Sequence, residues 1–87
     1  MRQLEQTILE NARRELDAVL TYYRKKSEGT NVEEFDEAWR DYLGHFNTMN
    51  AYLMLAHQAK SGLSAEGVQA LIRLEDEHAA AHRAAVN

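Results

Sequence analysis

The segment VEEFDEAWRDYLGHFNTMNAYLMLAH, residues 32–57, carries large apolar side chains that recur at alternating steps of four and three. This spacing places one apolar stripe along a helix that packs lengthwise against other helices. The segment also contains the only Trp and both Phe residues of the chain, which have to be covered from water. We therefore predict that it forms the core helix of the fold. Its apolar stripe consists of Phe35, Trp39, Tyr42, Phe46, Met49, Leu53 and Ala56.

A first helix is predicted before this segment. Apolar residues recur with a helical period over residues 3–27, and Gly29 is a natural helix stop. Thr30 or Asn31, each followed three residues later by a glutamate, can cap the helix that comes next. Because the connection is short, we expect the first two helices to run antiparallel.

The second and third helices are predicted over residues 32–60 and 65–86. The apolar spacing continues past Gly44 without a change of phase, which favours one unbroken second helix. Gly62 is placed to end that helix, and Ser64 is placed to cap the next one. The long second helix is thus expected to lie at the centre of the bundle.

The chain has 87 residues, which is enough for one small domain over residues 1–87. It has no Pro and no hairpin turn signal, and no sustained alternation of apolar and polar residues predicts a sheet. We predict an all-α fold, a three-helix antiparallel bundle with a long central helix. A core of this size is marginal, and many small helical chains gain stability by pairing, so we expect a homodimer.

Composition excludes several classes of function. The chain has no Cys, which rules out thiolate metal sites and cysteine catalysis, and a cytoplasmic location is the default. Its formal charge of −4 argues against binding to nucleic acid through phosphate neutralisation. No apolar run approaches membrane-spanning length, so no membrane association is expected. Without a nucleophile elbow or a glycine-rich phosphate loop, we expect no enzyme activity.

Glu75, His78 and His82 suggest a metal site as one alternative function. They fall on the same side of the predicted third helix as its apolar residues. Glu75 and His78 have the Glu-x-x-His spacing that di-iron bundles use, because side chains at i and i+3 point together into a bundle core. Antiparallel packing would add His45 at the same level. We expect a hydrogen-bonded polar layer without a cofactor here, with iron or zinc binding as the alternative.

A second alternative comes from the segment from Ala56 to Gly62, in which His57 is followed three residues later by Lys60. This segment resembles in part the signature of histidine phosphotransfer domains, which are helical bundles with a phosphorylated His on a helix. The resemblance implies that His57 is the phosphoacceptor and that Lys60 stabilises the phosphoryl group. The same two residues are also suited to cap the C-terminus of the second helix with positive charge. The matching positions are Ala56, His57, Lys60, Gly67, Leu71 and Leu74.

Apolar and aromatic residues outside the stripes indicate an interaction surface. A three-helix bundle covers only part of a helix's circumference, so these residues are expected to need a further partner. Tyr and Met are also enriched at protein–protein interfaces. We therefore predict a small non-catalytic interaction module, an adaptor, regulator or inhibitor, that binds a protein partner or a second copy of itself. The predicted binding residues are Tyr22, Leu43, Tyr52, Met54 and Leu55.

Overall fold

A computed structural model describes residues 2–28 and 32–86 of the chain, with side chains at positions 3–26 and 37–85. It contains three α-helices, and the residues described include no β-strand, which confirms the all-α prediction. The helices are α1 (Arg2–Glu28), α2 (Val32–Leu53) and α3 (Ala65–Val86), and a short 3₁₀ helix, η1 (Met54–His57), follows α2. The predicted stop at Gly29 and caps at Thr30 and Asn31 lie outside the described residues, as does the side chain of Phe35.

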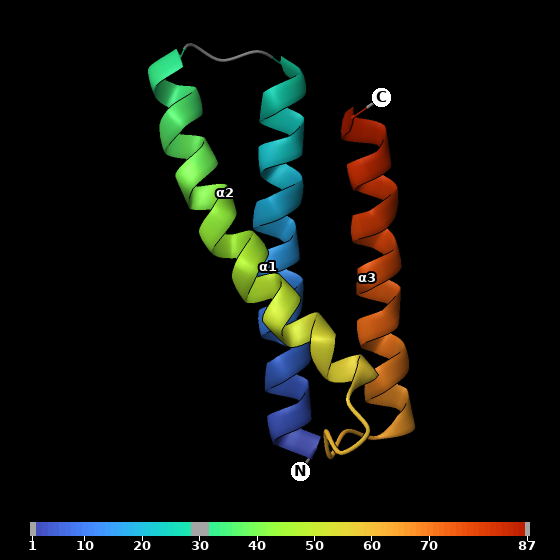
Figure 1. Cartoon of the computed structure of the whole chain (residues 1–87). Coiled ribbons are helices and arrows are strands. Elements are labelled where there is room, and N and C mark those ends of the chain that lie inside the picture. Colours follow the sequence, from blue (N-terminus) through green and yellow to red (C-terminus); the bar gives the residue numbers. More distant parts are fainter. Residues whose placement is uncertain (1, 29–31, 87) are drawn as a thin grey trace.

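α1 is the helix on which the other two pack. Figure 1 shows α3 running alongside α1, while α2 crosses α1 obliquely and brings η1 close to the first turns of α3. At the opposite end of the molecule, α2 and α3 diverge on the two sides of α1. The molecule is accordingly elongated, with principal extents of 44 × 23 × 17 Å.

The buried core confirms the central position of α1 and corrects the prediction that the second helix is central. Among the side chains described, at positions 3–26 and 37–85, five of the eight buried apolar residues belong to α1, whereas α2 supplies two and α3 one. A helix that lies between two neighbours buries a wider arc of its surface than a helix with one neighbour. The core consists of Ala12, Leu16, Val19, Tyr22, Tyr23, Met49, Leu53 and Leu71.

The second helix passes Gly44 without interruption but ends earlier than predicted. α2 stops at Leu53, and the chain continues to His57 as a 3₁₀ helix rather than as α-helix to residue 60. Gln58 then takes an extended conformation, with φ −92° and ψ 127°. Such a tight 3₁₀ turn is a common way for a helix to finish. Gly62 follows with φ 80°, a backbone conformation that favours glycine.

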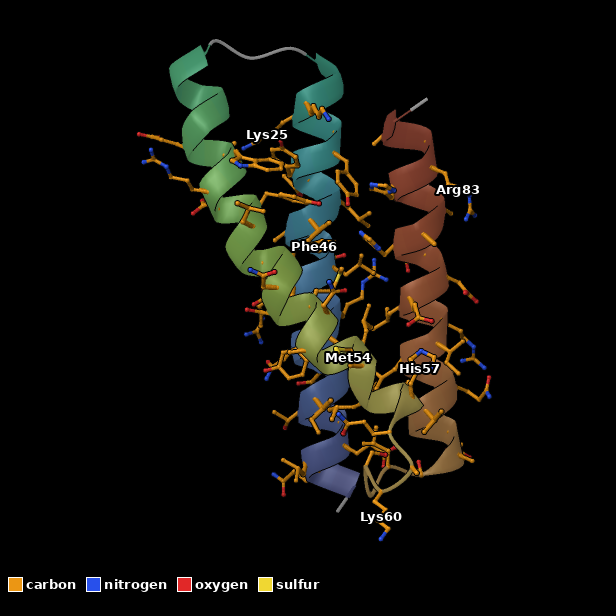
Figure 2. The ribbon with its side chains drawn as sticks, viewed as in Figure 1. Lys25, Phe46, Met54, His57, Lys60 and Arg83 are labelled. Carbon is orange, nitrogen blue, oxygen red and sulfur yellow. The ribbon has the colours of Figure 1, made fainter. Side chains whose placement is uncertain are left out.

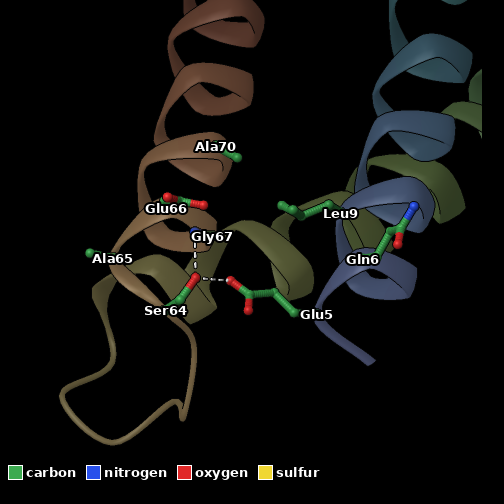
Figure 3. Close-up of a pocket in the computed structure, with 8 residues that line it drawn as sticks. All are labelled: Glu5, Gln6, Leu9, Ser64, Ala65, Glu66, Gly67 and Ala70. Carbon is green, nitrogen blue, oxygen red and sulfur yellow. Dashed lines mark hydrogen bonds between the residues drawn. The ribbon is translucent and has the colours of Figure 1, made fainter. Parts of the chain in front are cut away.

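A contact between Glu5 and Ser64 joins the start of α1 to the start of α3 (Figure 3). The Ser64 hydroxyl donates to Glu5 Oε1 at 2.5 Å, and it accepts a hydrogen bond from the Gly67 N–H at 3.1 Å. Ser64 therefore caps α3 as predicted. Gly67 is buried under the Glu5 carboxylate, and a Cβ at position 67 would lie only 1.6 Å from Glu5 Oε1. The missing side chain is what allows this carboxylate to reach the helix N-terminus.

We predict that Gly67→Ala changes the free energy of unfolding in two opposing ways. Combining it with Glu5→Ala should separate the two effects. Alanine in a helix is favoured over glycine by about 0.5–1 kcal/mol, but in the native chain its Cβ displaces the Glu5 carboxylate from Ser64. Urea denaturation of the two single variants and the double variant should give a coupling of about 1 kcal/mol, with Gly67→Ala stabilising only when Glu5 is absent. An equal effect in both backgrounds would refute this role for Glu5.

Candidate functional site: an aromatic groove beside α1

Aromatic rings from all three helices gather at the end of the molecule where α2 and α3 diverge. Each ring contacts at least one other, with ring centroids between 4.4 and 6.2 Å apart. Such pairs contribute stability beyond the area that they bury. We call this set the aromatic cluster. It consists of Tyr22, Tyr23, Trp39, Tyr42, Phe46, His78 and His82.

Trp39 is the outermost large ring of the aromatic cluster. It stacks on Tyr42 with centroids 5.4 Å apart, and Tyr42 stacks in turn on Tyr22 at 4.4 Å. Tyr22 is 6% exposed, whereas Trp39 is 44% exposed. The indole therefore rests on a buried base of rings and keeps one side open. Its exposure was not predicted from the sequence, which placed Trp39 in the buried stripe.

A chain of hydrogen bonds ties the three helices together beneath Trp39. The Tyr23 hydroxyl lies 2.9 Å from His78 Nε2 on α3 and 3.2 Å from the Tyr42 hydroxyl on α2. Burial raises the pKa of Tyr23, and its hydrogen bond to Tyr42 acts in the same direction. Burial also lowers the pKa of His78, and the nearby His82 lowers it further. Both effects favour the neutral form of His78, which lies at the α3 end of a network centred on Tyr23.

Five members of the aromatic cluster, all except Phe46 and His78, line a cavity of about 210 Å³ between the diverging helices. We call it the aromatic groove. Its walls are largely aromatic, with the Lys26 ammonium as the one charged group among the lining residues. The volume suits a large side chain rather than a drug-sized ligand, for which pockets of about 300 Å³ or more are usual. The lining residues are Tyr22, Tyr23, Lys26, Trp39, Tyr42, His82 and Ala85.

The five residues predicted to form a binding surface have different positions. Leu43 and Met54 are exposed, at 38% and 60% respectively. Tyr52 is half-buried, and its hydroxyl accepts a hydrogen bond from Asn11 at 3.3 Å. Leu55 is also half-buried. Tyr22 lies in the core, so its place in an exposed surface is corrected; it forms the base of the groove because α1, and not α2, is central.

Of the residues predicted to share a metal site, His78 and His82 are neighbours, but Glu75 and His45 are engaged elsewhere. Glu75 accepts from His57 Nε2 at 2.8 Å, whereas His78 contacts Tyr23 and His45 pairs with Glu15 at 2.5 Å. Over positions 3–26 and 37–85, no three His, Asp or Glu side chains are arranged to hold a metal ion. Glu75 is engaged by His57 because the short η1 turn brings His57 against α3.

His57 and Lys60 lie at the other end of the molecule from the aromatic groove (Figure 2). The His57 side chain is 58% exposed despite its contact with Glu75, and Lys60 is exposed in the turn that follows η1. Phosphotransfer through His57 is untested and stays a prediction.

We predict that acidification destabilises the fold in part through His78. Because its native pKa lies below the ordinary value of 6.5, the unfolded chain binds a proton at this position more readily than the native chain. Stability linked to His78 is therefore present above about pH 6.5 and is lost as the pH falls below that value. Urea denaturation in EDTA-containing buffer at pH 7.5 and pH 5.0 should show a smaller loss for His78→Gln than for the native chain. Equal losses would contradict this sign.

No protein-family model, curated protein sequence or solved structure matches this chain. Among the helices as described, none is long and apolar enough to cross a membrane. The function is therefore argued from the geometry of the aromatic groove and the side chains around it.

Proposed function

We propose that this chain is a non-catalytic protein–protein interaction module whose binding surface is the aromatic groove together with the adjoining exposed side of α2. One observation carries the proposal, the 44% exposure of Trp39 above a buried stack of rings. The module would act as an adaptor, a regulator or an inhibitor, because each of these roles requires only a surface that binds a protein.

The support for Trp39 as an anchor comes from its rigidity. Tyr42 and Tyr22 hold the indole from below, so little conformational freedom remains for a partner to remove. Tryptophan and tyrosine are over-represented among the residues that dominate binding free energy, especially where neighbouring contacts exclude water. A partner that covers Trp39 would also close the aromatic groove beside it.

Leu43 extends the apolar surface along α2. It lies about one helical turn after Trp39, on the same side of the helix, and is 38% exposed. Two apolar residues at this spacing beside a groove suit the binding of an amphipathic helix, which buries its apolar side between two others. In this chain the helix would lie against α2 and α3 where they diverge.

A second copy of the chain is the simplest occupant of this surface. The chain weighs 10.0 kDa, and self-association is a common source of stability for helical chains of this size. An interface of two copies would bury Trp39 and Leu43 without a different partner. Another protein that presents an amphipathic helix could fill the same place.

We predict that Leu43→Lys abolishes binding while leaving the fold intact. Leu43 is 38% exposed and is not among the residues packed against the core, so the free energy of unfolding should change by about 0.5 kcal/mol or less, whereas a charge inside an apolar interface is costly. Thr48→Lys is the matched control, because it adds the same charge at an exposed position about 2.5 turns after Trp39, on the other side of α2.

The native chain, Leu43→Lys and Thr48→Lys would be compared by sedimentation equilibrium and by their capture of partners from the native host. Trp39 fluorescence would report locally on the binding surface. The native chain and Thr48→Lys should form a complex that shifts the Trp39 emission to shorter wavelength, and Leu43→Lys should not. A monomer that retains nothing, or a partner that Leu43→Lys retains equally well, would refute the proposal.

A further inference from the structure

We infer that His78 and His82 form a two-histidine site for a divalent transition-metal ion of the Zn²⁺, Ni²⁺ or Cu²⁺ class, at the α3 side of the aromatic groove. The inference is independent of the proposed interaction function. It is also narrower than the iron or zinc site predicted from the sequence, because Glu75 takes no part in it.

The spacing of the two rings supports chelation. His78 and His82 lie one turn apart on α3, which places their side chains on the same side of the helix, as in the paired His ligands of helical zinc sites. Their ring centroids are 6.0 Å apart, and their planes differ by 32°. Two imidazoles bound to one ion at about 2.0–2.1 Å would have centroids roughly 5–5.5 Å apart. The two ring centroids would therefore have to approach each other by about 1 Å or less to bind one ion, which small side-chain rotations can achieve.

The Tyr23 hydroxyl engages one of the two His78 ring nitrogens. It lies 2.9 Å from Nε2, and Nδ1 is free to bind an ion in the tautomer whose Nε2–H donates to the Tyr23 oxygen. Histidine ligands usually make such a second contact through the nitrogen that does not touch the metal, and this contact orients the ring. Tyr23 is itself held by Tyr42, so the orientation of His78 is set by all three helices.

The groove provides room for the ion and its remaining ligands. Of the two histidines, His82 is exposed and lines the cavity of about 210 Å³, which can hold several waters that complete the coordination, whereas His78 is half-buried next to His82 and does not line the cavity. Lys26 lines the same cavity and repels a cation, so it weakens binding. Glu75 is engaged by His57, and the donor set is thus two imidazoles without a carboxylate. Such a set favours Zn²⁺, Ni²⁺ and Cu²⁺ over Mg²⁺ or Ca²⁺.

Thermal unfolding with and without metal ions tests the site. The full chain without a histidine tag would be melted in chelator-free buffer with ZnCl₂, NiCl₂ or MgCl₂. We expect Zn²⁺ and Ni²⁺ to raise the Tm and Mg²⁺ to leave it unchanged, because only an ion that binds the native state stabilises it. The rise should disappear in His78→Gln and in His82→Gln. His57→Gln, which changes an exposed histidine outside the groove, should keep it.

A second variant tests whether the ion lies in the groove. Removing the cation in Lys26→Gln should tighten Zn²⁺ binding by about two- to fivefold in calorimetric titration, because a partly exposed like charge costs at most a modest amount. The inference is overturned if neither ion raises the Tm of the native chain, if His82→Gln keeps the full rise, or if Lys26→Gln leaves the Zn²⁺ affinity unchanged. His82→Gln alters an exposed position, so loss of folding does not confuse the result.

Discussion

The burial of α1 between two other helices is the constraint on which the rest of this structure depends. Leu16 and Val19 are completely buried on α1, and two other completely buried residues of the same core, Met49 and Leu71, come from α2 and α3. A helix with neighbours on two sides needs a wider apolar arc than a single stripe provides, and α1 has it. Most of the buried core side chains described therefore belong to one helix, and α2 and α3 each bury their apolar side mainly against it.

The aromatic groove follows from this arrangement. Because α2 crosses α1 obliquely, it can approach α3 at one end only, and at the other end aromatic rings fill part of the space between them. Three polar contacts between described elements lie outside the groove: the Arg13–Glu77 ion pair, and the hydrogen bonds of Glu15 with His45 and of Glu75 with His57. Partly exposed contacts of this kind contribute little stability. At the groove, hydrogen bonds among Tyr23, Tyr42 and His78 tie the three helices together.

The sequence predicted the helices well because their signals are local. Periodic apolar residues locate each helix, and Ser64 caps α3 as its residue type suggests. The choice of the central helix was wrong because a heptad stripe shows that a helix has a buried side but not how many neighbours bury it. For the same reason Trp39 was assigned to the core, although α2 has already diverged from α3 at that level. The pairing of Glu75 with His57 could not be predicted, because it depends on the 3₁₀ turn of η1. The apolar spacing of the sequence continues through this turn, so the sequence does not show where α2 ends.

Native-state hydrogen exchange tests the central position of α1 most directly. Amides that exchange only when the whole chain unfolds mark the most stable part of a structure, and those that exchange by local opening mark the periphery. If α1 carries the core, amides of residues 12–23 should exchange with the free energy of global unfolding, whereas those of residues 37–44 on α2 should exchange at a lower free energy. Protection in residues 37–44 that equals or exceeds the protection in residues 12–23 would contradict the central role of α1.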